Sequence, residues 1–206
     1  VGPTRTWTID TQGSSDLQIT SGPLEGSVTN STSATFTVSA TGAAQYRFSL
    51  DGAWSAWGVD NSVTYKNLSD TKHTFTFEAK DDADNISVGP TRTWTIDTQG
   101  SSDLQITSGP SGPTNQNIVT FTVSATGAAQ YRYSTNNGQT YGSWGASNSY
   151  TTDLKDGSYV FIFQAQVAAG NISTGPTRNF TVDTQAPTSL AIEAYPPSPT
   201  NTNSAT

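Results

Sequence analysis

The chain has no cysteine and no methionine, and His73 is the only histidine among its 206 residues. The absence of cysteine excludes disulfide bonds, thiolate metal sites and cysteine nucleophiles. A single imidazole provides no histidine pair for zinc and little basis for a catalytic triad. We therefore expect no cofactor and no enzymatic activity.

Charge is also scarce. Charged residues make up 12% of the chain, about half of the roughly 25% of an average soluble protein. The net charge of −7 argues against a nucleic-acid partner, because such partners require a basic surface. No apolar run approaches the roughly 18 residues of a membrane span. Because hydrophobic residues, at 33%, are scarce as well as charged ones, disorder is left open, but 10% aromatic residues oppose it, since disordered chains are poor in aromatics.

Internal repetition dominates what is present. Residues 1–23 recur letter for letter at 88–110, and residues 35–47 recur at 120–132. The period of about 86 residues is too long for a solenoid unit and suits a small β-sandwich. We expect the chain to be a window of a longer tandem array. The frame predicts the last strand of a preceding repeat (1–10), repeat 1 (11–97), repeat 2 (98–183), and a linker with the first strand of a following repeat (184–206).

Period-2 alternation predicts β-strands, with one face buried and the other wet. Phe36, Val38 and Ala40 alternate with Thr and Ser, and Thr suits an exposed strand face without adding charge. Seven short strands per unit indicate an all-β sandwich. In repeat 1 they are expected near 16–20, 34–41, 45–50, 54–58, 62–66, 72–80 and 91–97.

Turn signals agree with this assignment. Asp51-Gly52 and Asn137-Gly138 are strong hairpin signals, because both turn residues require positive φ. A leucine, a short turn and an aromatic residue precede the long strand of each unit, which resembles a tyrosine corner. Tyr159 would hold this corner in repeat 2, and His73 takes the matching place in repeat 1.

Several motifs resemble the immunoglobulin-like and fibronectin type III-like tandem repeats of large secreted or surface-attached bacterial proteins. They are YRFSLDG, HTFTFEAKDDADN, TRTWTIDTQ and the closing TVDTQAP. The resemblance covers nearly the whole chain. It implies tandem seven-stranded sandwiches without disulfides and an extracellular or cell-surface location, in an adhesin stalk or a filament.

The recurring tryptophans allow two interpretations. Trp94 is replaced by Phe180 in repeat 2, which favours a core position. Trp57 and Trp144 match each other after the hairpin turn; we expect them in the core or as an edge plug, with a carbohydrate-stacking platform as the alternative. Three recurring arginines are expected to pack over aromatic rings: Arg5, Arg92 and Arg178.

Acidic residues offer the only candidate metal ligands. Asp81, Asp82 and Asp84 favour a solvated turn, with weak calcium binding as the alternative. The aspartates that recur at each unit end are expected to cap turns, although they leave open an interdomain cation. These are Asp10, Asp97 and Asp183.

Two further features concern the surface. Asn85 and Asn171 lie in matching Asn-Ile-Ser sequons and would be the first places to look for glycan. Val160 and Ile162 replace threonines on a wet strand face; they are either scattered surface residues or a lateral contact with another chain.

The leading hypothesis is therefore a non-catalytic structural segment of a long extracellular protein, acting as an extended mechanical spacer. Its expected partners are neighbouring repeats of the same chain and, in a filament, copies of itself. The alternative is a carbohydrate-binding or accessory module of a secreted polysaccharide-active protein.

Overall fold

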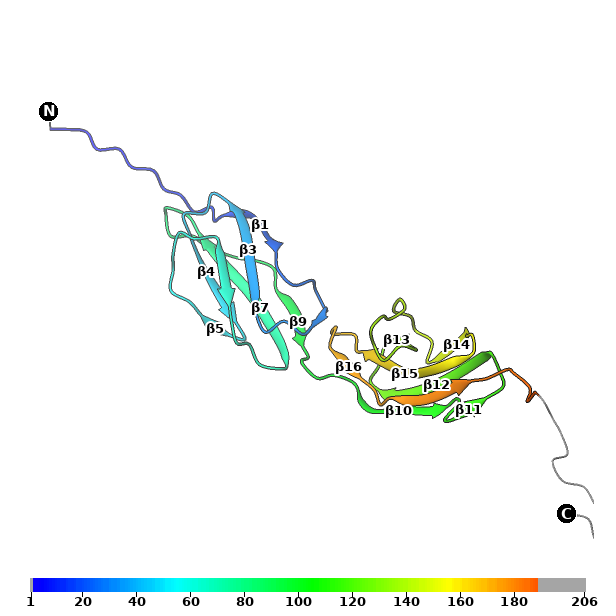
Figure 1. Cartoon of the computed structure of the whole chain (residues 1–206). Helices are drawn as coiled ribbons and strands as arrows, with labels where there is room; N and C mark the ends of the chain where they lie inside the picture. Colours follow the sequence, from blue (N-terminus) through cyan, green and yellow to red (C-terminus); the bar gives the residue numbers. More distant parts are fainter. Residues whose placement is uncertain (1, 189–206) are drawn as a thin grey trace, which may run out of the picture.

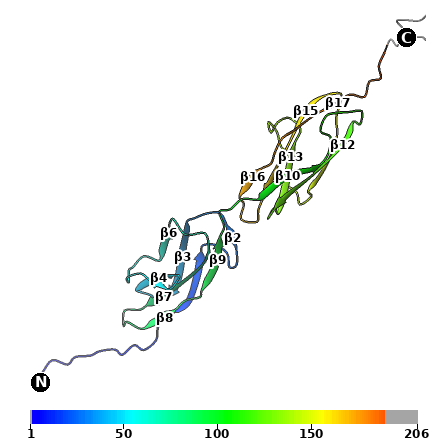
Figure 2. The ribbon, with the colours of Figure 1, turned by 90° about the horizontal axis from the view of Figure 1, so that it is seen from below.

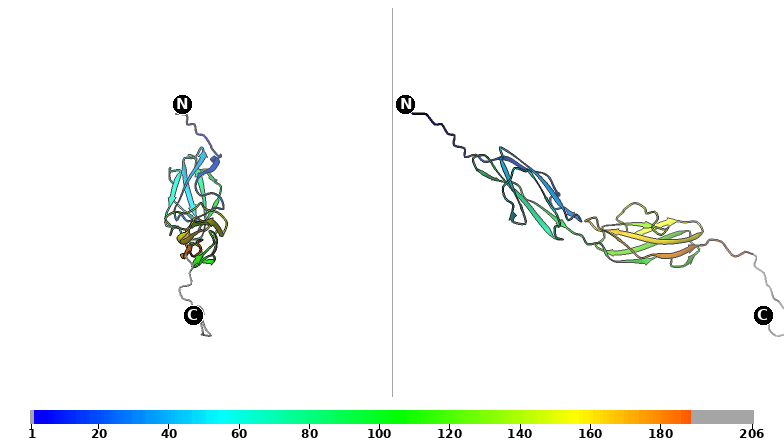
Figure 3. Two further views of the ribbon diagram at one scale, coloured as in Figure 1. Left: turned by 45° about the vertical axis from the view of Figure 1, so that its right-hand side comes forward. Right: turned by 60° about the vertical axis from the view of Figure 1, so that its left-hand side comes forward.

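The computed structural model describes residues 2–188, and every regular element in this range is a β-strand. The strands form two sandwiches that follow each other along the chain (Figure 1). The chain enters each sandwich at one end and leaves at the opposite end, as Figures 2 and 3 also show.

Repeat 1 pairs a three-stranded sheet, in the order β1-β3-β6, with a larger sheet in the order β2-β9-β7-β4-β5. The short strand β8 adds to β7. The strand β5 joins the larger sheet through β4, whereas a constant-type immunoglobulin domain has a fourth strand in the other sheet. The strands are β1 (Ser15–Ser21), β2 (Val28–Thr29), β3 (Ala34–Thr41), β4 (Gln45–Leu50), β5 (Ala53–Trp54), β6 (Ser62–Tyr65), β7 (Lys72–Lys80), β8 (Ile86–Val88) and β9 (Arg92–Ile96).

Repeat 2 has the same topology. Its sheets have the orders β10-β12-β14 and β11-β17-β15-β13, with β16 paired to β15. No counterpart of β5 forms within the described part of this repeat. The strands are β10 (Ser102–Ser108), β11 (Pro113–Thr114), β12 (Ile118–Thr126), β13 (Gln130–Ser134), β14 (Ser149–Asp153), β15 (Gly157–Gln166), β16 (Ile172–Thr174) and β17 (Arg178–Val182).

The core of each sandwich follows from the alternation in the sequence. Along β7, buried and half-buried residues alternate, with the apolar residues inside. Phe36 of one sheet stacks on Phe75 of the other, with ring centroids 3.8 Å apart. Phe121 and Phe161 repeat this contact in the second sandwich at the same distance. Aromatic stacking between the sheets therefore forms the centre of both cores.

The predicted all-β sandwich is confirmed. At the turn between β4 and β5, Asp51 and Gly52 have φ values of 51° and 87°, as the Asp-Gly signal predicts. Sequence analysis missed the two short edge strands β2 and β8, and it placed at 54–58 a strand that ends at Trp54.

Strands of neighbouring repeats were expected at both ends of the chain, at residues 1–10 and within residues 184–206. At the first of these, where the last strand of a preceding repeat was expected, residues 2–10 contain no strand, and residue 1 lies outside the described residues. A strand requires a hydrogen-bonding partner. The following repeat's first strand, expected within 184–206, falls largely on residues 189–206, outside the described residues.

Candidate functional site

His73 lies at the start of β7, 2% exposed, beneath the turn that precedes this strand. Its Nε2 lies 2.9 Å from the Ser69 carbonyl oxygen and its Nδ1 lies 2.8 Å from Asp51 Oδ2. Both partners are acceptors, so only the doubly protonated imidazolium satisfies both. Burial lowers the pKa of His73, but the hydrogen bonds to Asp51 and Ser69 outweigh burial and raise it.

Tyr159 takes the same position in repeat 2, where its hydroxyl donates to the Lys155 carbonyl at 2.9 Å. The bond spans four residues, as does the bond from His73 to Ser69. Both side chains thus tie the start of the long strand to the preceding turn, which is the geometry of a tyrosine corner.

The corner residues pair with the large aromatic residues of the last strand. His73 is the cross-strand partner of Trp94, and Tyr159 is the partner of Phe180. The centroid distances are 5.4 Å and 5.5 Å. In repeat 1 the small imidazole of His73 pairs with the large indole of Trp94. In repeat 2 the larger ring of Tyr159 pairs with the smaller ring of Phe180. Trp94 is 1% exposed, and its Nε1 has no hydrogen-bond partner among the described residues.

Trp57 and Trp144 lie outside the cores of their repeats. Neither belongs to the core cluster of its repeat, and both are half-buried. Trp57 packs over Arg47 of β4, and Trp144 over Arg132 of β13, with the guanidinium carbons 4.8 Å and 4.6 Å from the ring centroids. The core position is wrong, because these tryptophans pack against arginine on the outer face of the larger sheet; the edge plug, the other position expected, stays a prediction.

A second aromatic ring completes each of these groups. Trp54 lies over Arg47 and Tyr141 over Arg132, each with its centroid at 4.8 Å. Arg47 Nε also donates to Glu78 at 2.6 Å, and Arg132 Nε donates to the Gln164 side chain at 2.7 Å. We call these groups the arginine–aromatic clusters. The sequence signal for them was the QYR triplet in both repeats, which sequence analysis treated only as part of a strand.

Arg92 and Arg178 bind main-chain oxygens. Arg92 donates to the Pro23 carbonyl at 3.1 Å. Arg178 donates to the carbonyls of Gly109 at 3.3 Å and Ile106 at 2.9 Å. Strand parity correctly predicted that Arg92 shares a face with Trp94, but the expected aromatic partner was wrong. Arg178 thus reaches from the last strand to β10 of the other sheet, and Arg92 reaches the connection between β1 and β2.

The acidic turn of repeat 1 is held by its own hydrogen bonds. Asp81 accepts from the backbone amides of Ala83 and Asn85, both at 2.9 Å. Asp84 pairs with Lys80 at 2.7 Å. The hydrogen bond from the Asn85 side chain lowers the pKa of Asp81, although burial opposes it. Within residues 2–188, no group of three His, Cys, Asp or Glu is arranged to hold a metal ion.

The recurring aspartates close turns in the linkers. Asp10, Asp97 and Asp183 each accept from the backbone amide two residues on, at 3.0, 2.9 and 3.0 Å. This is the Asx-turn geometry that the spacing predicted.

Asn85 and Asn171 are half-buried, not free surface positions. Each side-chain amide donates to two carbonyls of the linker that precedes its repeat. N-glycosylation uses this same nitrogen, so these bonds argue against glycan in the folded protein. Sequence analysis missed this role because the partners lie more than 70 residues away along the chain.

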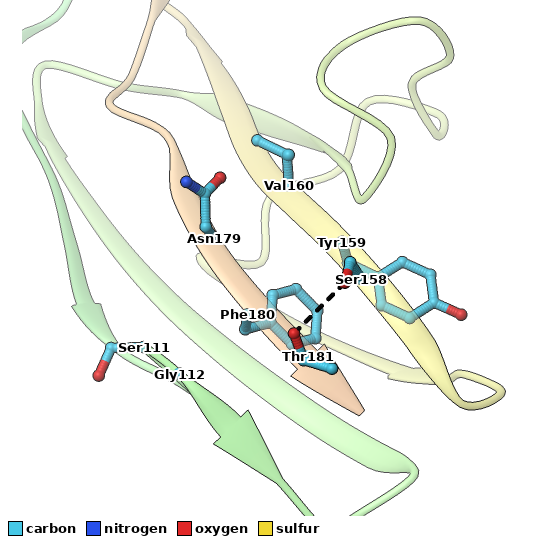
Figure 4. A pocket seen from close by; sticks show the side chains of 8 residues that line it. All are labelled: Ser111, Gly112, Ser158, Tyr159, Val160, Asn179, Phe180 and Thr181. Atoms are coloured by element: carbon cyan, nitrogen blue, oxygen red, sulfur yellow. Dashed lines mark hydrogen bonds between the residues drawn. The ribbon is translucent and has the colours of Figure 1, made fainter. Parts of the chain in front are cut away.

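A shallow groove lies beside β17 in repeat 2, between this strand and the segment before β11 (Figure 4). Val160 and Asn179 lie along it, and Ser158 lies 3.4 Å from Thr181 between their hydroxyl oxygens. Val160, like Ile162, is half-buried. In repeat 1 the matching edge is closed, because the Glu25 carboxylate accepts from the Thr93 amide and hydroxyl at 2.8 and 2.7 Å.

No helix in the described part of the chain is long and apolar enough to span a membrane.

No family model and no curated protein matches the sequence. Solved structures do match. The fibronectin(III)-like modules of Clostridium thermocellum CbhA give a TM-score of 0.56 at 11% identity, over 81% of this chain and 93% of that one. The FN1-FN3 domains of chicken CNTN1 give 0.51 at 10% identity, over 88% of this chain and 69% of that one. At such low identities the likeness shows the fold alone: the chain is built of tandem fibronectin III-like β-sandwiches.

Proposed function

We propose that the chain is a non-catalytic structural segment of a long extracellular protein, acting as an extended mechanical spacer. The observation that carries this proposal is the position of the chain ends in each sandwich. The chain enters at one end and leaves at the other (Figure 1), so each added repeat lengthens the array. A fold whose ends met on one side would build a compact cluster instead.

The surface composition supports the same role. The outer faces of β3 and β6 carry threonine and serine, and Thr35 and Thr64 hydrogen-bond across the strands at 2.8 Å. Thr120 and Thr151 repeat this contact in the second sandwich. Such faces remain wet without charge, so parallel copies experience little electrostatic repulsion. This suits a stalk or a filament at a cell surface, and it supports copies of the chain as partners.

Small-angle X-ray scattering of the 206-residue chain tests the spacer role. We expect an elongated particle whose pair-distance distribution has a long tail; a symmetrical, compact distribution would contradict the proposal. Labelling of intact cells of the source organism with an antibody against the repeats tests the location. Signal only after lysis would refute a surface position.

The arginine–aromatic clusters favour a second candidate, a carbohydrate-binding module. Two aromatic rings flank one arginine at the same place in both repeats, and Trp54 is 41% exposed. Aromatic faces stack on sugar rings, although here each ring already faces a guanidinium. Retention of the chain on insoluble polysaccharides, abolished by Trp54→Ala, would support this candidate. Passage through the matrix without retardation would exclude it for those glycans.

A further inference from the structure

The linker between the two sandwiches is short and polar, with the sequence Asp-Thr-Gln-Gly-Ser-Ser at residues 97–102. A Gly/Ser-containing linker of this kind would ordinarily act as a flexible connection. Here it is hydrogen-bonded on both sides. We propose that Asp70, residues 97–99 and Asn171 form a clasp that fixes repeat 2 against repeat 1 in one orientation. This inference rests on the proposed spacer role for its biological use.

The outgoing side of the clasp belongs to repeat 1. Asp70, in the turn before β7, accepts from the Thr98 amide at 2.9 Å and from the Thr98 hydroxyl at 2.6 Å. These bonds lower the pKa of Asp70, although burial opposes them. Asp156 makes the same two bonds to Thr184 after repeat 2, at 3.0 and 2.9 Å. The chain therefore leaves both repeats through the same pair of aspartate–threonine hydrogen bonds.

The incoming side belongs to repeat 2. Asn171 Nδ2 donates to the carbonyls of Asp97 at 2.7 Å and Gln99 at 2.9 Å. Asn85 makes the equivalent bonds before repeat 1, to Asp10 at 3.1 Å and Gln12 at 3.3 Å. Asn171 thus uses both of its N–H groups to hold the preceding linker, whereas Asn85 also donates to the Asp81 carboxylate at 2.9 Å.

Two further backbone amides of the linker are also hydrogen-bonded. The Asp97 amide donates to the Thr29 carbonyl at 2.9 Å, and the Gln99 amide donates to the Asp97 side chain at 2.9 Å. The linker lies close against β16, because a Cβ placed on Gly100 would collide with the Ser173 hydroxyl. The backbone of residues 97–100 therefore has little freedom to rotate.

The two repeats also touch directly. The Asn30 amide, after β2 in repeat 1, donates to the Ala169 carbonyl in the turn before β16, at 3.1 Å. Each repeat carries both halves of the clasp: an outgoing aspartate, and an incoming asparagine. The partner that fits each end of a repeat is therefore another repeat of this type with a preceding Asp-Thr-Gln linker. A joint repeated in this way gives each step of an array the same rotation.

The substitution Asn171→Asp tests the clasp, because it keeps the side-chain shape and replaces the donor with an oxygen that faces two carbonyl oxygens. Asn85→Asp is the control: it makes the same change at the linker before repeat 1, where Asn85 also donates to the Asp81 carboxylate at 2.9 Å, and it leaves the joint between the repeats intact. Residual dipolar couplings of the whole 206-residue chain, measured separately for each sandwich, report the relative motion of the two repeats.

We expect one alignment tensor to fit both repeats in the parent chain and in the control variant N85D. In N171D the two repeats should require tensors of different magnitude. Asp70→Ala provides a second test from the other side of the joint, should N171D unfold repeat 2. Separate tensors in the parent chain, or one shared tensor in both N171D and D70A, would overturn the proposal. A flexible joint could still give an elongated scattering particle, so this test and that of the spacer role fail independently.

Discussion

Raising the pH should destabilise repeat 1 and leave repeat 2 unaffected. Above its pKa, His73 loses one ring proton, and either the Asp51 carboxylate or the Ser69 carbonyl loses its donor. The matching corner of repeat 2 contains no imidazole, because Tyr159 donates there through its hydroxyl. The protein therefore contains its own control for the titration.

The sign follows from the direction of the pKa shift. The pKa of His73 is raised on folding, so the contribution is fully present below the unfolded histidine pKa of about 6.5. It is lost as the pH rises through the higher folded value. A hydrogen bond to a charged group contributes about 1.5–3 kcal/mol. Because the Asp51 side chain is 45% exposed, water screens the pair, and we expect a loss of about 1 kcal/mol.

Chemical denaturation followed by NMR measures the unfolding free energy of each repeat from its own amide signals. Repeat 1 should lose stability relative to repeat 2 as the pH rises from about 5 to about 9, a range that includes the titration of histidine. The double substitution H73Y/W94F transplants the corner pair of repeat 2 and should remove this difference. Equal pH profiles for the two repeats, or a repeat 1 that gains stability with pH, would refute the assignment of an imidazolium.

The remaining predictions concern repeat 2. Gly175→Ala should lower its unfolding free energy by about 1–3 kcal/mol, as overpacking does, because a Cβ there would collide with the Phe163 ring; Gly112→Ala, with open space around the Cβ, should lower it far less in the same denaturation experiment. Arg132→Met should lower the unfolding free energy by about 0.5–1 kcal/mol through loss of the cation–π contact. It should also change the fluorescence of Trp144, the only tryptophan of this repeat, and an unchanged spectrum would contradict the stacked geometry.

Alternation along the chain was sufficient to predict the sandwich. Phe75, Phe77 and Ala79 appear at every second position of one strand, and all three are buried. A side-chain period of two fixes which residues share a face. The short edge strands were missed because a strand of two or three residues carries no period.

The partners of outward-facing side chains could not be predicted in the same way. Parity places Arg47 on the wet face of β4, but the rings over it come from residues that follow the hairpin turn. Trp57 has no strand parity of its own, so the sequence could not separate a core position from a position over arginine. The three-dimensional course of the loop decided between them.

By itself, the sequence determined the strand faces and the Asx turns, since each depends on residues near one another along the chain. Only the tertiary structure decided the role of Asn171, whose two acceptors lie in the linker more than 70 residues earlier. An asparagine followed by Ile-Ser appears in the sequence as a potential glycan site. Folding brings its amide to unpaired carbonyls, and buried or half-buried polar groups require such partners.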